Sequence, residues 1–309
     1  MKLGFVSAIL ADQNLDQVLS FAEQEKFQCV ELMCWPQGKA ERRYAGVTHI
    51  DVINLNDTKA DEIKGKVADK GLAISSLGYY PNPLASDFDE AQISIDHLTA
   101  LIQTAPKLNV DLVTTFIGRD PSQSVVEIWP RFLEVWTPLV KLAEDCGVRI
   151  GIENCPMYFS NDEWPSGKNL AISPGIWRRM FSDISSEHFG LNYDPSHLLW
   201  QQMDHVKPIK EFADKLFHVH AKDAIINREA LDDVGILSTP LEYHTPKLPG
   251  LGEINWGKFF SALSQVDYTG PVCIEVEDRP YEKTLEGRQG ALRQSARFLR
   301  QFLSEELAV

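Results

Sequence analysis

The stretch Val148-Arg149-Ile150-Gly151-Ile152-Glu153 is a short apolar run that ends in a carboxylate, and three later stretches are similar runs that end in a carboxylate or an imidazole. They are Phe189-Gly190-Leu191-Asn192-Tyr193-Asp194, Leu216-Phe217-His218-Val219-His220 and Val272-Cys273-Ile274-Glu275. A fully buried parallel strand requires a continuous apolar run without polar alternation. In an α/β barrel the chemistry gathers where such strands end. The pattern therefore predicts four barrel strands whose last side chains meet at one mouth: Glu153, Asp194, His220 and Glu275.

These four side chains predict a metal site. Three carboxylates buried together are electrostatically costly unless a cation compensates them. Three carboxylate oxygens and one imidazole suit a hard to borderline divalent ion, and the lack of a thiolate ligand disfavours a closed structural zinc site. Any one of these carboxylates alone could equally be half of a structural ion pair, but four at successive strand ends favour a metal.

The alternation of strand and helix patterns runs along the whole chain. Strands are predicted at Leu3–Ala8, Cys29–Met33, Ala73–Leu77, Leu112–Phe116, Val148–Glu153, Phe189–Tyr193, Leu216–His220 and Val272–Val276. Helices are predicted at Leu15–Lys26, Lys59–Lys70, Asp89–Leu108, Val125–Cys146, Pro174–Ser182, Val206–Asp214, Trp256–Gln265 and Thr284–Glu306. This order predicts an α/β fold, a single (β/α)8 TIM barrel that takes residues 1–309 as one domain. A doubly wound sheet is the alternative, but no Gly-x-Gly-x-x-Gly follows the first run.

Three long segments follow predicted strands: Trp35–Asp57, Asn154–Ile172 and Ala221–Asn255. Loops beyond about 12–15 residues in a compact domain are usually functional or disordered. All three lie on the face where the four polar side chains would meet. We expect them to form the walls of a pocket and, for Ala221–Asn255, a lid.

Composition excludes several classes of function. The formal net charge of −14 would repel a polyanion, and no Lys/Arg cluster with interleaved aromatic residues is present, so nucleic acid is not an expected partner. No apolar stretch approaches the ~18 residues that span a bilayer, so no membrane association is expected. Five cysteines, odd in number and widely spaced, favour reduced thiols and a cytoplasmic location. A homo-oligomer is compatible with the sequence.

Several segments together resemble the xylose-isomerase-like barrel superfamily, which includes sugar isomerases and epimerases, inosose dehydratases and endonuclease IV. They are Ile152-Glu153-Asn154, Asn192-Tyr193-Asp194-Pro195-Ser196-His197, His218-Val219-His220-Ala221-Lys222-Asp223, Pro249-Gly250-Leu251-Gly252-Glu253-Ile254-Asn255-Trp256 and Ile274-Glu275-Val276-Glu277. The resemblance implies one divalent ion, Mn²⁺, Mg²⁺, Co²⁺ or Zn²⁺, held by Glu153, Asp194, His220 and Glu275. It also implies that Glu153 and Glu275 double as acid and base. The choice of His220 over His218 as the ligand rests on this match.

Four further residues are expected to contact a substrate: His197, Lys222, Asp223 and Trp35. His197 follows Asp194 by three residues, which on a helix places both on one side. Lys222 and Asp223 could instead form an ion pair that seals the barrel mouth. An aromatic ring such as that of Trp35 can stack on a sugar, although core packing explains an aromatic residue about as well.

The sequence departs from two branches of the superfamily. Ketose 3-epimerases carry a substrate-binding glutamate and an arginine at the positions that here hold Phe159 and Ile226. Endonuclease IV has extra histidines on its early strands, whereas the third and fourth predicted strands here have none. We therefore expect a carbohydrate substrate and a metal-dependent sugar or keto-sugar isomerase or epimerase that removes a proton next to a carbonyl and forms an enediolate. The alternatives are a dehydratase or lyase on a keto-sugar or 2-keto-inositol through the same enolate, and a non-catalytic sugar-binding barrel.

Overall fold

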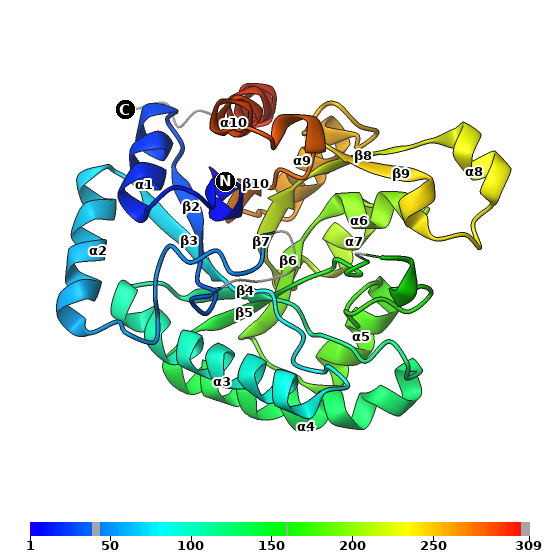
Figure 1. The fold of residues 1–309 in the computed structure, drawn as a ribbon, viewed down its shortest axis with the longest axis horizontal. Coiled ribbons are helices and arrows are strands. Elements are labelled where there is room, and N and C mark those ends of the chain that lie inside the picture. Colours follow the sequence, from blue (N-terminus) through cyan, green and yellow to red (C-terminus); the bar gives the residue numbers. More distant parts are fainter. Residues whose placement is uncertain (39–43, 159, 304–309) are drawn as a thin grey trace.

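The computed structural model describes residues 1–38, 44–158 and 160–303 of the chain. Eight parallel strands close into a barrel in the order β1-β10-β7-β6-β5-β4-β3-β2 (Figure 1). Their bounds are β1 Lys2–Val6, β2 Cys29–Met33, β3 Ala73–Gly78, β4 Leu112–Thr115, β5 Arg149–Glu153, β6 Phe189–Tyr193, β7 Leu216–Ala221 and β10 Pro271–Ile274. The predicted barrel is confirmed, because all eight predicted runs form its strands.

Helices surround the strands on the outside of the barrel (Figure 1). The eight predicted helices correspond to α1 Leu15–Gln24, α2 Asp57–Asp69, α3 Phe88–Thr104, α4 Val125–Cys146, α5 Pro174–Asp183, α7 Lys207–Glu211, α9 Trp256–Gln265 and α10 Leu285–Leu299. Short 3-10 turns extend α3, α7 and α10 at Ala105–Leu108, Ala213–Lys215 and Arg300–Phe302. The end of the predicted last helix, residues 304–306, lies outside the described residues.

Local signals explain where the helices begin and end. The long helix α4 starts with a capping box, in which the Ser124 side chain accepts from the Glu127 backbone N–H and the Glu127 side chain accepts from Ser124. It ends at Gly147, whose left-handed φ of 66° favours glycine. The buried face of α4 packs Trp129, Phe132 and Trp136 onto the barrel core.

The segment after β7 is more regular than the sequence indicates. Residues 221–255 contain an antiparallel hairpin, β8 Asp223–Ile226 and β9 His244–Lys247, with α8 Arg228–Val234 between its strands. The hairpin projects from the barrel at the right of Figure 1. A further short helix, α6 Pro195–Trp200, follows β6 directly and begins at Pro195 after the N-cap residue Asp194, in agreement with the helical spacing of Asp194 and His197. The expectation of one irregular loop at 221–255 is therefore wrong, because the two short strands satisfy each other's backbone groups.

Candidate metal centre

The four predicted ligands all lie at the barrel mouth, at the carboxyl ends of consecutive strands in the barrel order. Glu153 is the last residue of β5, Asp194 caps the N-terminus of α6 directly after β6, His220 lies in β7, and Glu275 directly follows β10. The parallel pairing of β10 with β7 brings Glu275 close to the level of His220 along the barrel axis, since Cys273, two residues before Glu275, lies opposite His220. The side chains of Glu153, Asp194 and His220 are buried, and that of Glu275 is 19% exposed.

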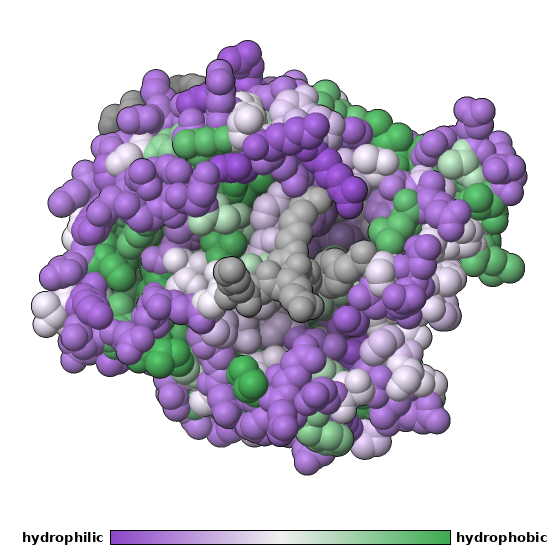
Figure 2. All heavy atoms as spheres, in the orientation of Figure 1, coloured by the Kyte–Doolittle hydropathy of each residue, from purple (hydrophilic) through white to green (hydrophobic). Residues whose placement is uncertain are grey.

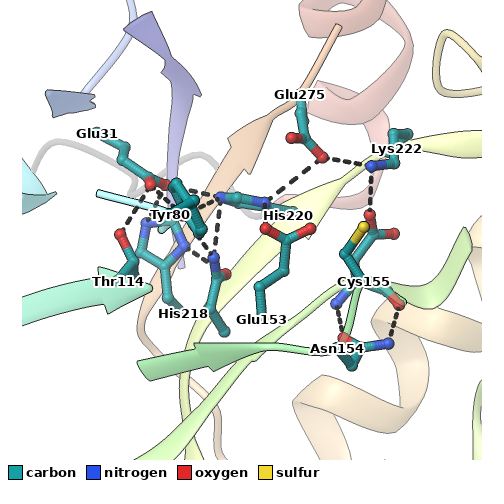
Figure 3. Close-up of polar contacts among 12 residues, drawn as sticks. Glu31, Tyr80, Thr114, Glu153, Asn154, Cys155, His218, His220, Lys222 and Glu275 are labelled. Atoms are coloured by element: carbon teal, nitrogen blue, oxygen red, sulfur yellow. Dashed lines mark hydrogen bonds and ion pairs between the residues drawn. The ribbon is translucent and has the colours of Figure 1, made fainter. Parts of the chain in front are cut away.

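Three of the four ligand side chains converge on one point. Glu153, His220 and Glu275 each offer one ligand atom within 4.8 Å of the other two. The Nδ1 atom of His220 lies 3.7 Å from a Glu153 oxygen and 3.6 Å from a Glu275 oxygen, as Figure 3 shows for Glu275. Asp194 is not in this group. Its Oδ2 atom instead lies 3.2 Å from His197 Nε2.

Lys222 occupies the space between Asp194 and Glu275. Its Nζ atom lies 2.6 Å from Glu275 Oε2 and 3.0 Å from Asp194 Oδ2. A third carboxylate, Glu277, is also 3.0 Å away. The side chain of Lys222 is 3% exposed, so this ammonium group is a buried cation among carboxylates (Figure 3). A metal ion at this centre would share these carboxylates with Lys222.

The donor set fits a divalent ion. His220 Nδ1 and Asp194 Oδ2 are both buried and make no hydrogen bond to any residue within the described ranges, and Lys222 approaches Asp194 only as an ion pair. Burial raises the pKa of Asp194 even though Lys222 lowers it. Burial and Glu275 oppose the ionisation of Glu153, but His220 and His197 lower its pKa to about 2. Glu153, Asp194, His220 and Glu275 are therefore the residues that would hold the ion, with oxygen and nitrogen donors only.

A buried hydrogen-bond network holds His220 from the opposite side. The Glu31 carboxylate on β2 lies 2.7 Å from His220 Nε2, so this nitrogen carries the proton and Nδ1 faces the centre. Glu31 also accepts hydrogen bonds from Tyr80 and from Thr114 Oγ1, the latter at 2.7 Å. Gly78 makes room for it, because a Cβ there would lie 2.7 Å from a Glu31 oxygen. Sequence reasoning missed Glu31, although a carboxylate inside the apolar run Cys29-Val30-Glu31-Leu32-Met33 is itself an unusual signal.

His218 belongs to the same network and not to the three-ligand group. Its Nδ1 atom lies 2.9 Å from Asn192 Oδ1 and its Nε2 atom lies 3.1 Å from Ser75 Oγ. Asn192 in turn lies 3.0 Å from His220 Nε2. Both nitrogens of His218 are thus engaged by side chains of the network.

The predicted substrate-contact residues fall into two groups. His197 and Lys222 meet at 3.1 Å beside the metal centre, and Trp35 lines the cavity above it. Asp223 points elsewhere: its carboxylate accepts from the backbone N–H of Gly250 and Ile254 and from Trp256 Nε1. These bonds tie the start of the hairpin to the loop before α9. The position favours a structural role for Asp223 in place of the predicted substrate contact, and it forms no pair with Lys222.

A cavity opens above the centre. The side chains on the face of the molecule shown in Figure 2 are mostly hydrophilic. The inner part of the cavity has an open volume of about 630 Å³, including the solvent at its mouth, and is lined by Glu153, Glu275 and apolar side chains such as Met33 and Phe116. Of the departures from ketose 3-epimerases, Phe159 lies outside the described residues, and Ile226 is a buried hairpin residue. Arg228 pairs with Glu253. Ile226 and Arg228 do not line the cavity, so the arginine of the ketose 3-epimerases has no counterpart at these two positions.

The comparison with protein families decides the assignment of this barrel. The family model described as xylose isomerase-like TIM barrel matches residues 19–302. The chain belongs to this family. The resemblance inferred from the motifs is thereby confirmed.

Relatives and solved structures of the family differ in their named activities. The chain is 26% identical to the protein YfiH of Bacillus subtilis (strain 168), over 99% of this chain and 100% of that protein. It is also 26% identical to an inosose dehydratase of Geobacillus thermodenitrificans (strain NG80-2), over 81% of this chain and 86% of the relative. Among solved structures, D-psicose 3-epimerase with D-tagatose from Clostridium cellulolyticum H10 has a TM-score of 0.70 at 17% identity, covering 99% and 100% of the two chains. The IOLI protein with a zinc atom has a TM-score of 0.69 at 18% identity, with coverage of 99% and 100%.

The family assignment fixes the broad class. The chain is a xylose isomerase-like barrel, and the proteins similar to it include an epimerase and a dehydratase. It also has a group of potential ligands for a divalent metal. Within the described ranges no helix is both long and apolar enough to cross a membrane.

Proposed function

We propose that the chain is a divalent-metal-dependent isomerase or epimerase of a sugar or keto-sugar, which removes a proton next to a carbonyl. The observation that carries the proposal is the convergence of Glu153, His220 and Glu275 within 4.8 Å at the base of a cavity. The ion, Mn²⁺, Mg²⁺, Co²⁺ or Zn²⁺, would be held by these residues and Asp194. When bound, it would polarise the substrate carbonyl and make the neighbouring C–H more acidic.

Glu153 and Glu275 are the proposed proton carriers. Glu153 ends β5 and Glu275 directly follows β10, and these strands are separated in the barrel by β6 and β7, so the two carboxylates approach the centre from different sides. A general base must be ionised, and the pKa of both carboxyls lies below its usual range. Burial opposes this shift in both, but His220 and His197 lower the pKa of Glu153, and Lys222 and His220 lower that of Glu275. One glutamate can therefore take the proton while the other returns it on the opposite face.

Lys222 favours a second candidate reaction, the elimination of water by a dehydratase or lyase. Its ammonium group touches Glu275 and Glu277 and lines the cavity. In this reaction a glutamate removes the α-proton, the β carbon–oxygen bond breaks, and the electron pair of the C–H bond forms the carbon–carbon double bond. Lys222 gives its proton to the departing oxygen, which leaves as water. The inosose dehydratase similarity agrees with such a step.

Deuterium exchange distinguishes these functions. The protein is incubated in D₂O with each of the four ions and a panel of ketoses and 2-keto-inositol, and the products are followed by NMR and mass spectrometry. Isomerisation or epimerisation incorporates deuterium at the carbon next to the carbonyl without loss of water, whereas a lyase releases water. No exchange with any ion and any member of the panel would indicate a sugar-binding protein and contradict both reactions.

Substitution of each glutamate tests the two-base assignment. Glu153→Gln and Glu275→Gln each keep an oxygen ligand but remove a base. For an epimerase we expect one variant to exchange deuterium from only one epimer without completing inversion, and the other variant to show the mirrored defect. Near-wild-type turnover in both metal-loaded variants would mean that the carboxylates do no more than hold the ion.

A further inference from the structure

The cavity has a second part that the proposed chemistry does not need. We call it the outer lobe; it is lined by Tyr158, Trp200, Leu241, His244 and Asp278, among others, and has an open volume of about 1670 Å³ including the solvent at its mouth. The inner lobe, lined by Glu153 and Glu275, holds the reacting groups. The two lobes share Tyr44, Cys155, Lys222 and Glu277, so they are continuous at the metal centre. A single sugar ring over Glu153 and Glu275 would leave the outer lobe to solvent.

Asp278 gives the outer lobe a polar group with unused bonding capacity. Its side chain is 1% exposed, and its Oδ2 atom accepts no hydrogen bond from any residue that the structure describes. Asp278 stands at the N-cap of the 3-10 turn Arg279–Tyr281, yet its side chain does not cap that turn. Lys247 of β9 holds the other oxygen at 3.2 Å. A buried carboxylate oxygen without a donor is costly, and a hydroxyl group of a ligand would satisfy it.

Aromatic side chains form the wall beside Asp278. The His244 and Trp200 rings stack with centroids 4.9 Å apart and an interplanar angle of 22°. Trp200 also donates a hydrogen bond to His197 at 3.3 Å, which connects this wall to the metal centre. Flat rings beside a hydrogen-bond acceptor are suited to a ligand with apolar C–H faces and hydroxyl edges, such as a sugar ring.

We propose that the substrate is a two-unit carbohydrate, a keto-sugar that carries a second ring through a glycosidic bond. The keto unit occupies the inner lobe, and the second ring lies in the outer lobe, where a hydroxyl donates to Asp278 Oδ2. This inference rests on the proposed function, because it assumes that the reacting unit lies over Glu153 and Glu275.

The charges of the outer lobe favour a neutral second unit over a phosphate group. Asp278 and Glu277 both line it, and a phosphate bonded at Asp278 would place two anions in contact. Lys222 is already surrounded by carboxylates, and Arg279 is exposed at the rim. A hydroxyl group, by contrast, can donate the hydrogen bond that the Asp278 Oδ2 atom lacks.

The test is calorimetric titration of the metal-loaded full chain with D-fructose, D-fructose 6-phosphate and four ketose disaccharides: turanose, maltulose, lactulose and isomaltulose. In these disaccharides a ketose unit carries a second ring at different positions. We expect at least one to bind about tenfold more tightly than D-fructose, as a charge-assisted hydrogen bond allows. Asp278→Asn should remove that advantage and leave D-fructose affinity unchanged, whereas the surface control Asp69→Asn should change neither.

Each alternative outcome overturns the proposal. If no disaccharide binds more tightly than D-fructose, if none binds at all, or if the phosphate ester binds best, the outer lobe does not receive a second ring. If Asp278→Asn weakens D-fructose and disaccharide equally, Asp278 is not specific for that ring. Should Asp278→Asn fail to fold, His244→Ala tests the same wall with the same expectation. Deuterium exchange and metal content are measured in parallel, so that failure of the metal chemistry is told apart from failure of the outer lobe.

Discussion

At the scale of single residues, the contact between Glu31 and His220 shows how the centre is oriented. A metal-ligating histidine generally donates its other ring N–H to a carboxylate or carbonyl, which fixes the tautomer. Here Glu31 lies 2.7 Å from His220 Nε2, in a fully buried pair. The Nδ1 atom is thereby directed at Glu153 and Glu275.

Loss of the Glu31 charge is expected to weaken metal binding. Glu31→Gln keeps the shape of the side chain but no longer favours the His220 tautomer with Nδ1 free. We expect metal affinity, measured by competition with a chromogenic chelator, to fall about 10–100-fold. The control Glu127→Gln changes an exposed capping residue of α4 and should not alter it. Unchanged affinity in Glu31→Gln would mean that the network does not orient the ligand.

Lys222 is expected to act on metal affinity in the opposite direction. Its ammonium group competes with a divalent cation for Asp194 and Glu275. Lys222→Met removes that positive charge at similar length, so metal affinity should rise while turnover falls. The surface variant Lys141→Met should leave both unchanged. A loss of metal affinity in Lys222→Met would show that the lysine supports the site instead of competing with the ion.

At the scale of elements, the β8–β9 hairpin brings the half-buried His244 to the outer lobe. Burial lowers its pKa to about 4, although a bond from Nδ1 to the Pro240 carbonyl opposes the shift. The folded chain thus keeps His244 neutral at pH values where the unfolded chain binds a proton, near the ordinary histidine pKa of about 6.5. The hairpin should therefore lose stability as the pH falls below that value.

This linkage predicts a pH-dependent difference between the wild type and His244→Gln. Between about pH 7.5 and pH 5 the wild type should lose about 2 kcal/mol of unfolding free energy relative to the variant, because only the wild type gains a proton on unfolding at this position. Urea denaturation of both proteins at several pH values measures the difference. A constant difference across this range would contradict a histidine that stays neutral in the folded chain.

The sequence predicted the elements of the barrel well and the hairpin poorly. Buried parallel strands such as β2 and β6 are mostly apolar runs, each with one polar residue, Glu31 or Asn192, and their bounds agree with the prediction to the residue. The strands β8 and β9 have four residues each, and β9 contains Pro246. They pair across an intervening helix, and neither strand carries a pattern that points to its partner. Glu31 was missed for a similar reason, since its contacts Tyr80 and His220 lie 49 and 189 residues away along the chain.

At the scale of the whole molecule, the proposed metal would connect four strands that are consecutive in the barrel, β5, β6, β7 and β10. Among the described residues, Lys222 and histidines lie next to their ligand carboxylates and compensate part of the negative charge. The chain also carries a formal net charge of −14, which adds repulsion to the compact state. An ion bound only by the folded chain would offset part of both costs.

Metal removal should therefore destabilise the entire barrel. An ion that binds the folded chain alone adds about 4 kcal/mol to the unfolding free energy when its free concentration is about 1,000 times Kd. We expect EDTA to lower the thermal midpoint of the wild type, and readdition of the ion that binds best to restore it. Asp194→Asn removes one ligand charge while keeping its shape, so its metal content should fall and its midpoint should respond little to either treatment. Asp69→Asn, an exposed residue of α2, should behave like the wild type. An equal EDTA response in the wild type and Asp194→Asn, with full metal occupancy in both, would show that the ion binds elsewhere and that β6 contributes no ligand.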